Sequence, residues 1–251
     1  MNANVGALAH GMVSKVRIFS MNLVFQVQIP PNGGRSEGRK VFHYAEDLYK
    51  FSSKKALAYA EFTEADYFCL KSDEWLGKEY SPAYHKLYIY ELFKEGYDKI
   101  LYIDSDIIVK EDTPNIFDMY DVLSACQDKS NSPSGLKKQQ RDREKYNLRE
   151  DYKYFCSGVV LFDRKFYEKT KDHWREELKK PQPQHDQSLF NILCNNYYGN
   201  CNILSNDWGH WTNRNPRTKK YMIHHASGWK KSFSTLGFLD GKPFNESDYD
   251  V

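Results

Sequence analysis

The sequence predicts a single α/β domain in which helices flank a mainly parallel central sheet. Short apolar runs alternate with segments of helical periodicity, and a strand–helix–strand order favours parallel pairing. The 251 residues are 40% hydrophobic and 16% aromatic, enough for one sizeable core. No long linker rich in Pro, Gly or Ser divides them. We therefore expect one domain over residues 15–251, after a loose terminus at residues 1–14 that lacks the features of a secretory signal.

The first elements follow from apolar patterning. Residues 16–21 predict a strand, and the Pro- and Gly-containing stretch at residues 30–34 predicts an exposed loop after it. Apolar side chains at helical spacing predict a helix over residues 45–60. The aromatic run at residues 66–70 then predicts the second strand.

The best-marked helix is expected to begin at Ser81, whose hydroxyl suits an N-cap, with Pro82 at the first helical position. Gly96 suits the left-handed conformation that ends a helix. The apolar run at residues 99–103 predicts a buried strand, which continues into Asp104-Ser105-Asp106.

The second half of the chain opens with a highly charged segment at residues 127–151, for which a mobile loop and a solvated helix are both compatible with the sequence. A strand is expected at residues 155–162, because this run is apolar and aromatic. Polar residues at helical spacing predict a helix at 168–179, and a further helix is expected over residues 186–195, after a Pro/Gln turn.

Composition excludes several classes of protein. The 36 basic and 34 acidic side chains leave a net charge of +2, which gives no reason to expect a nucleic-acid partner. No run approaches the roughly 18 apolar residues of a membrane helix, so we expect a soluble protein without a transmembrane segment. The 5 cysteines show no CxxC spacing. A reducing compartment, and hence a cytoplasmic location, is the simpler expectation.

Asp104 and Asp106 are the first candidates for chemistry. Two carboxylates one residue apart at the carboxyl end of a buried strand can reach one cation, and ligands of open α/β sheets bind at that end. Hard oxygen ligands suit Mg²⁺ or Mn²⁺, which often complete their shell with phosphates. Taken alone, a DxD sequence is more often a solvated or capping pair than a metal site.

Four segments in order carry a resemblance to a known family. They are residues 97–109 (YDKILYIDSDIIV), residues 155–162 (FCSGVVLF), residues 185–191 (HDQSLFN) and residues 223–230 (IHHASGWK). Together they resemble the metal segment, the N-[SA]-G strand, the DQ..LN helix start and the closing H-x-x-G-x-x-K element of the glycogenin-like glycosyltransferases, family 8 of the GT-A fold. The resemblance covers residues 16–231, nearly the whole chain.

The resemblance implies a single GT-A domain with a nucleotide-sugar-binding half at residues 15–109. Residues 110–251 would supply the acceptor half and the closing metal and phosphate element. The implied reaction moves a sugar from a nucleotide sugar, most often a UDP-hexose, to a hydroxyl of a glycan or protein-linked acceptor, with retention. A divalent ion, Mn²⁺ or Mg²⁺, stabilises the charge that builds on the leaving diphosphate.

Metal ligands implied by the resemblance are Asp104, Asp106 and His224. The adjacent His225 is the competing ligand, because neighbouring strand residues point to opposite faces. Lys230 would neutralise the leaving diphosphate, with a solvated basic end beside Lys231 as the alternative. The remaining donor-binding candidates are Lys86, for which a surface lysine is the alternative, and Ser105, Ser157, Gly158 and Gly228, the last permitting close backbone approach.

The implied catalytic residues are Asp186, which would hold hydroxyls of the transferred sugar, and Gln187, on the ring face opposite the leaving group. Asp186 is also compatible with a helix N-cap. An amide is a poor nucleophile, so front-face attack assisted by the leaving phosphate is favoured over a covalent intermediate on Gln187. The sequence departs from the family at Cys156, where Asn is common. The position of the aromatic residue that stacks on the donor base is also not clear in the sequence, and Tyr44 is a candidate.

Two other functions stay open at this point. Haloacid-dehalogenase phosphatases also carry DxD after an apolar strand, although the flanking residues here differ from theirs. A non-catalytic sugar-binding GT-A scaffold is the second alternative, since fold alone does not establish activity.

The charged segment at residues 127–151 is expected either to become ordered over bound donor or to remain a solvated helix. Trp208, Trp211 and Trp229 are compatible with an acceptor platform or with core packing. The oligomeric state is left open.

Overall fold

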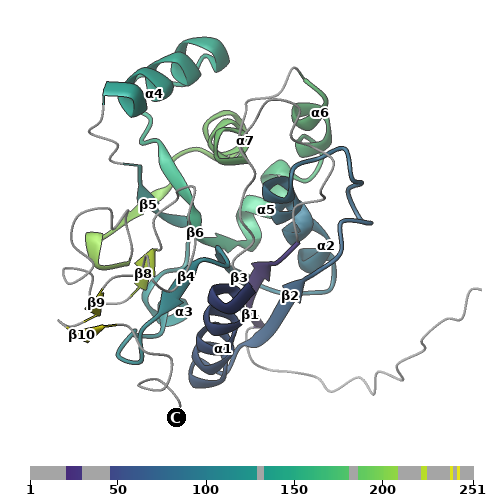
Figure 1. Ribbon diagram of the computed structural model, residues 1–251. Helices are drawn as coiled ribbons and strands as arrows, with labels where there is room; N and C mark the ends of the chain where they lie inside the picture. The colour runs from purple at the N-terminus through teal and green to yellow at the C-terminus, as the bar shows by residue number, and fades with distance from the viewer. Residues whose placement is uncertain are drawn as a thin grey trace, which may run out of the picture.

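A six-stranded sheet forms the centre of the molecule in the computed structural model (Figure 1). The structure describes residues 21–29, 46–128, 133–180, 186–208, 222–224, 238–239 and 242–243. In spatial order the strands are β2 (Asp66–Leu70), β1 (Asn22–Val27), β3 (Lys99–Ile103), β6 (Phe155–Asp163), β5 (Ser124–Gln127) and β7 (Asn202–Leu204). Strand β6 is antiparallel to both of its neighbours, and the other described pairs are parallel. The predicted α/β class with a mainly parallel sheet is confirmed.

Helices lie on both faces of this sheet (Figure 1). In chain order they are α1 (Glu46–Phe62), the 3₁₀ helix η1 (Pro82–Tyr88), α2 (Ile89–Lys94), α3 (Ile116–Met119), α4 (Pro133–Tyr146), α5 (Arg164–Thr170), α6 (Trp174–Lys179), α7 (Asp186–Leu193), the π-helical turn η2 (Cys194–Tyr198) and η3 (Asn206–Trp208). Two small ribbons complete the described elements: β4 (Ile107–Val109) with β8 (Met222–His224), and β9 (Phe238–Leu239) with β10 (Lys242–Pro243). None of the helices described is both long and apolar enough to cross a membrane.

Alternation along the central strands divides the core into two layers. In β3, Ile100 and Tyr102 join a cluster with η1, α2, α5 and α7, whereas Leu101 and Ile103 join a cluster with α1. All four side chains are at most 2% exposed. Successive strand residues point to opposite faces, so a strand covered on both faces is apolar throughout. This explains why β3 stands out in the sequence as one continuous apolar run.

The first strand is the main correction to the predicted elements. Strand β1 spans Asn22–Val27, where the sequence predicted no strand. Of the strand predicted at residues 16–21, Met21 is not in a strand and residues 16–20 lie outside the described part. Its polar Gln26 is fully buried and donates from Nε2 to Ser52 Oγ at 3.0 Å. Because this glutamine is hydrogen-bonded inside the core, it can be buried although it is polar. The sequence pattern of the strand is therefore less apolar than that of a strand buried only by apolar residues.

The expected helix over residues 81–96 is divided into η1 and α2. Ser81 does not cap it with its side chain, so that prediction is wrong: its carbonyl instead accepts from Tyr84 N at 2.9 Å, the i→i+3 bond of a 3₁₀ turn. Gly96 has φ +104°, as its place after the helix predicts. The helix predicted over residues 168–179 is likewise divided, into α5 and α6.

The charged segment at residues 127–151 contains helix α4, which rules out a loop throughout. The exposed side chains of α4 agree with the solvated-helix alternative, but Asp142 is only 3% exposed. Trp208 is 1% exposed and packs edge-on against Tyr120, so it belongs to the core and not to an open platform. Trp211 and Trp229 lie outside the described residues.

Candidate functional site

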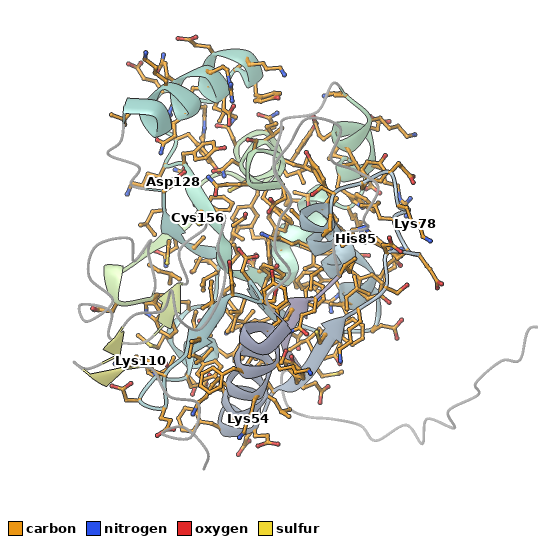
Figure 2. All side chains as sticks on the ribbon, viewed as in Figure 1. Lys54, Lys78, His85, Lys110, Asp128 and Cys156 are labelled. Carbon is orange, nitrogen blue, oxygen red and sulfur yellow. The ribbon has the colours of Figure 1, made fainter. Side chains whose placement is uncertain are left out.

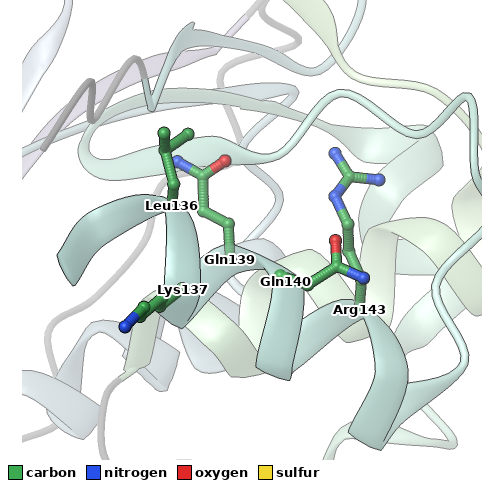
Figure 3. A pocket seen from close by; sticks show the side chains of 5 residues that line it. All are labelled: Leu136, Lys137, Gln139, Gln140 and Arg143. Carbon is green, nitrogen blue, oxygen red and sulfur yellow. The ribbon is translucent and has the colours of Figure 1, made fainter. Parts of the chain in front are cut away.

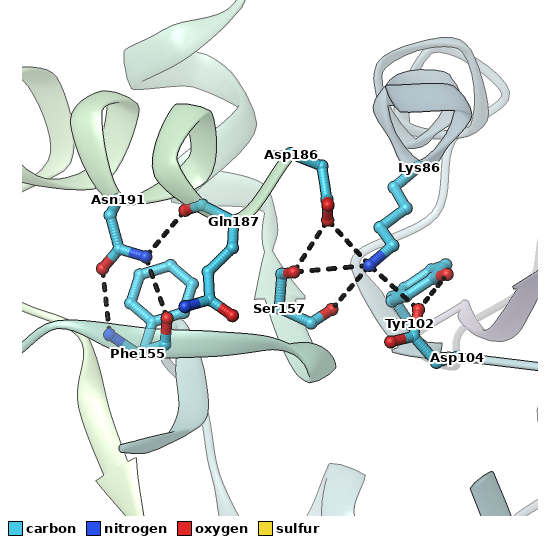
Figure 4. A network of polar contacts seen from close by, with 8 residues as sticks. All are labelled: Lys86, Tyr102, Asp104, Phe155, Ser157, Asp186, Gln187 and Asn191. Atoms are coloured by element: carbon cyan, nitrogen blue, oxygen red, sulfur yellow. Dashed lines mark hydrogen bonds and ion pairs between the residues drawn. The ribbon is translucent and has the colours of Figure 1, made fainter. Parts of the chain in front are cut away.

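A buried lysine joins three elements at the carboxyl end of β3. Lys86, from η1, is 5% exposed, and its Nζ lies 2.9 Å from Asp104 Oδ1 and 2.7 Å from Asp186 Oδ2. The same Nζ contacts the Ser157 carbonyl at 3.4 Å and its Oγ at 3.3 Å. Figure 4 shows Lys86 reaching from its helix to the carboxylates. The surface-lysine alternative is therefore wrong.

Asp104 is held at the tip of β3 by its own backbone and by a tyrosine. Its N–H donates to the Gly158 carbonyl at 2.8 Å, and Tyr102 OH donates to Oδ1 at 2.7 Å. A Cβ on Gly158 would lie 3.0 Å from Asp104 Oδ2, so the absence of a side chain there gives the carboxylate its room. Strands β3 and β6 together fix where this carboxylate points.

Asp106 lies where the chain turns from β3 into β4. It is 4% exposed, and Ser105 between the two carboxylates is half-buried. The register of β4 with β8 pairs Ile107 with His224, so the backbone of the late histidine lies one residue along from Asp106. Residues 118 positions apart in sequence are thereby brought to one ribbon beside the strand tip.

Helix α7 supplies the other wall of the site. Asp186 is its first residue and is 7% exposed, and Oδ2 accepts from Ser157 Oγ at 2.7 Å as well as pairing with Lys86. Gln187 is half-buried and donates from Nε2 to Asp128 Oδ2 at 2.8 Å. The Asp186 carboxylate thus faces the lysine, whereas Gln187 is tied to the end of β5.

Asn191 anchors α7 to β6 one turn further on. Its amide exchanges two 2.9 Å hydrogen bonds with the Phe155 backbone and donates to the Gln187 carbonyl at 2.8 Å (Figure 4). It is fully buried, so these bonds form where water does not compete. The helix that carries Asp186 and Gln187 is therefore rigidly positioned on the sheet.

The electrostatics of the site keep the lysine charged. Burial acts to lower the pKa of Lys86, but the carboxylates of Asp104 and Asp186 outweigh it and raise the pKa above its ordinary value. Nearby, burial raises the pKa of the Cys156 thiol to about 12, with the charges of Asp104 and Asp128 acting in the same direction. Figure 2 labels Cys156 on β6 and Asp128 at the end of β5. The site holds a cation beside a neutral thiol.

The structure brings together five of the residues expected at the site: Lys86, Asp104, Ser157, Gly158 and Asp186. The side chain of His224, and residues Tyr44, His225, Gly228 and Lys230, lie outside the described part of the chain. Sequence reasoning missed Tyr102, Asp128 and Asn191. The sequence spacing of Tyr102 and Asn191 could have indicated them. Tyr102 lies two residues before Asp104, on the same face of a strand, and Asn191 lies four residues after Gln187, on the same face of a helix.

The residues at the strand tip suit a divalent cation. Among the described side chains, no group of three His, Cys, Asp or Glu forms a complete metal site. Two carboxylates nevertheless lie at the turn from β3, and the β4–β8 register adds a histidine at the same place. Carboxylate oxygens are ligands that both Mn²⁺ and Mg²⁺ accept, whereas an imidazole ligand beside them suits a transition ion such as Mn²⁺ better than Mg²⁺.

The chain matches one known protein family over most of its length. Residues 35–227 match Glycosyl transferase family 8. The chain belongs to this family. Its members are glycosyltransferases, which removes the phosphatase alternative, and the resemblance noted from four sequence segments is confirmed. None of the curated proteins matches the chain.

Solved structures agree with this family 8 assignment at the level of fold. The crystal structure of a glycosyltransferase involved in glycosylation of the major capsid of PBCV-1 has a TM-score of 0.57 at 12% identity, over 83% of this chain and 96% of that one. The apo bifunctional glycosyltransferase WbbM gives 0.57 at 17% identity, over 88% of this chain and 48% of WbbM. The galactosyltransferase LgtC, solved with donor and acceptor sugar analogues, gives 0.50 at 18%, over 83% and 87%. The family 8 chain therefore has the GT-A fold.

Proposed function

We propose that this family 8 glycosyltransferase moves a hexosyl group from a UDP-sugar to a hydroxyl of a glycan or protein-linked acceptor, with retention. The observation that carries the proposal is the buried Lys86, paired with Asp104 and Asp186 at the carboxyl end of β3. Nucleotide-binding sites of open α/β sheets lie at this end. In this arrangement residues 15–109 form the donor half, and residues 110–251 form the acceptor half and the closing element.

Asp104, Asp106 and His224 would hold Mn²⁺ or Mg²⁺, which when bound stabilises negative charge on the diphosphate leaving group. Ser105 and Ser157 would contact the donor beside them. Gly228 and Lys230, on the closing element, would approach the diphosphate from the other side, the lysine adding a positive charge. Support for these roles comes from the match to family 8 and, for His224 alone, from the strand register that pairs it with Ile107.

Asp186 would accept hydrogen bonds from hydroxyls of the transferred sugar while Lys86 fixes its orientation. Gln187 would lie on the ring face opposite the leaving group, with its amide nitrogen held by Asp128. In front-face attack the C1–O bond to phosphate breaks as the acceptor oxygen bonds to C1 on the same face. The acceptor proton passes to the leaving phosphate oxygen, so no protein nucleophile is required.

Release of UDP from UDP-glucose, UDP-galactose and UDP-N-acetylglucosamine, with and without Mn²⁺, tests the proposal. We expect slow metal-dependent hydrolysis of at least one donor. Asp106→Asn should lower it by about a hundredfold, because electrostatic groups at the reaction centre are worth roughly that much. The matched control is Asp112→Asn, an exposed carboxylate six residues along the chain. Absence of UDP release from every donor would favour the non-catalytic sugar-binding scaffold.

A further inference from the structure

Helix α4 carries one carboxylate that does not face water. Most described side chains of α4 are exposed, but Asp142 is 3% exposed. A buried carboxylate is costly unless several hydrogen bonds satisfy it. The contacts of Asp142 therefore indicate what holds α4 in place.

Asp142 is bound by two hydroxyls from two other elements. Its Oδ2 accepts from Tyr154 OH at 2.9 Å and from Ser188 Oγ at 2.7 Å, and the two hydroxyls lie 3.0 Å apart. Tyr154 immediately precedes β6, and Ser188 belongs to α7. Both are 2% exposed. This triangle ties α4 to the two elements that carry the candidate site, and Ser188 directly follows Gln187.

A second contact of α4, one turn earlier, reaches the same place. Gln139 donates from Nε2 to the Asp128 carbonyl at 2.8 Å, and the Asp128 side chain accepts from Gln187 Nε2 at 2.8 Å. Asp128 N–H donates to the Tyr154 carbonyl at 3.0 Å. Asp128 is therefore hydrogen-bonded to α4 and to the residue before β6, while its side chain accepts from Gln187.

The hollow along α4 shares a residue with this network. A volume of about 400 Å³ is lined by Leu136, Lys137, Gln139, Gln140 and Arg143 (Figure 3). Gln139 is the residue that also binds Asp128. The hollow therefore belongs to α4 itself, and Gln139 links it to the backbone of Asp128, the partner of Gln187.

We propose that Asp142 is a positioning residue for sugar transfer: by binding Ser188 and Tyr154 it locks α4 onto the site, and the locked helix fixes the Asp128–Gln187 pair. The expected effect of Asp142 on turnover rests on the proposed function. Its expected effect on the position of Gln187 does not, so the test measures the two effects separately.

The test compares Asp142→Ala, Asp142→Asn and the exposed-carboxylate control Glu144→Ala on the same helix. The first measurement is the hydrogen-exchange rate of the Gln187 side-chain amide by NMR, assigned with Gln187→Ala. The Asn191 amide is the internal reference, because its nitrogen donates to carbonyls of β6 and α7 and not of α4. The second is the turnover, with Mn²⁺, of whichever of the three UDP-sugars the wild-type protein hydrolyses fastest.

In Asp142→Ala we expect the Gln187 amide to exchange about tenfold faster, the change expected when a buried hydrogen bond is lost, and turnover to fall about as much. Asp142→Asn keeps an acceptor oxygen and should stay within about twofold of wild type. Glu144→Ala should match wild type. If Asp142→Ala does not fold, Ser188→Ala removes one of the two bonds and should give the same direction of change.

An unchanged Gln187 amide in Asp142→Ala would overturn the proposal, as would faster exchange of Gln187 and Asn191 alike, since that is general loosening. Equal losses of turnover in Asp142→Ala and Glu144→Ala would also overturn it. If wild-type protein hydrolyses none of the three donors, the proposed function fails, and the Gln187 exchange rate alone decides whether Asp142 positions that side chain.

Discussion

Lys86 is a buried cation whose presence is explained by the two carboxylates around it. Asp186 has a side chain 9% exposed and Asp104 one 27% exposed, so neither is fully hydrated. Removing the cation leaves these charges close together with water largely excluded. One buried positive charge thus links η1 to the end of β3 and to α7 at the site.

Lys86→Met should destabilise the fold by about 3–5 kcal/mol, because it strands two partly buried carboxylates without their counter-charge. Urea unfolding at pH 7 measures the loss. Adding Asp186→Asn to Lys86→Met should recover part of it. Lys94→Met, which removes a lysine paired with Glu91 at the surface, is the control and should cost less than about 1 kcal/mol. A Lys86→Met effect no larger than the control would contradict this account.

Cys156 should be slow to alkylate despite being half-buried and not fully enclosed. With its thiol pKa raised to about 12, chiefly by burial, roughly one molecule in ten thousand is thiolate at pH 8. Iodoacetamide labelling of the Cys156 peptide, followed by mass spectrometry, should rise about tenfold per pH unit between pH 8 and 10. The same peptide in urea should label about a thousandfold faster at pH 8. Equal rates in folded and unfolded protein would count against the raised pKa.

At the scale of elements, the sequence located β2 and β3 to the residue and β6 to within one residue. These strands are short apolar runs bounded by polar residues, so local patterning suffices. Strand β1 was not predicted at Asn22–Val27, where Gln26 is polar in sequence but hydrogen-bonded inside the core. The 3₁₀ helix η1 packs against β1 and α7, and local sequence patterning does not record these contacts.

The candidate site shows the same division. Asp104, Asp186 and Ser157 were predicted from motifs, and their proximity follows from strand order. Asp128 and Asp142 were missed because their roles come from contacts between different elements, with Gln187 59 positions from Asp128 and Ser188 46 positions from Asp142. Nothing in the charged run around Asp142 separates a buried carboxylate from the exposed ones beside it.

Gly158 makes a close approach between β6 and β3 possible. Gly158→Ala places a Cβ 3.0 Å from Asp104 Oδ2, so the carboxylate must move by a few tenths of an ångström. We expect metal-dependent donor hydrolysis to fall about tenfold, since small misplacements of catalytic groups are costly. The free energy of unfolding should fall by about 1 kcal/mol.

Gly96→Ala is the opposite control to Gly158→Ala. Gly96 has φ +104°, and nothing lies within 4 Å of the position that a Cβ would take, so alanine meets backbone strain but no neighbour. It should cost about 1 kcal/mol of stability and leave hydrolysis unchanged. If donor hydrolysis falls in proportion to the loss of unfolding free energy in both variants, the local role of Gly158 is contradicted.

At the scale of the whole molecule, the central sheet and the β4–β8 ribbon bring distant parts of the chain together. The Lys86 contacts reach residues 71 positions away in Ser157, and the β4–β8 ribbon returns the late histidine to the strand tip. The core that supports this assembly contains many tyrosines. Several of their hydroxyls are buried and bonded to protein groups, among them Tyr90, Tyr102, Tyr152 and Tyr154.

These buried tyrosines predict unfolding at alkaline pH. Burial raises the pKa of each of the four hydroxyls above its ordinary value. In the unfolded chain tyrosines ionise near pH 10, so above that pH the folded state binds more protons and the free energy of unfolding falls as pH rises. Below about pH 10 the stabilisation is fully present.

Urea midpoints at pH 8, 9, 10 and 11 should therefore fall most steeply after pH 10. A smaller decline is expected below pH 10, because burial also raises the pKa of the Cys156 thiol, which ionises near pH 8.5 in the unfolded chain. Absorbance at 295 nm should show the four buried tyrosines ionising together with unfolding and not before it. Tyr90→Phe removes one of the four, together with its 2.7 Å bond to Thr170, and should reduce the slope above pH 10 by up to about 1.4 kcal/mol per pH unit. A wild-type midpoint unchanged at pH 11, or a Tyr90→Phe slope equal to that of wild type, would show that tyrosine ionisation does not limit the alkaline stability of this fold.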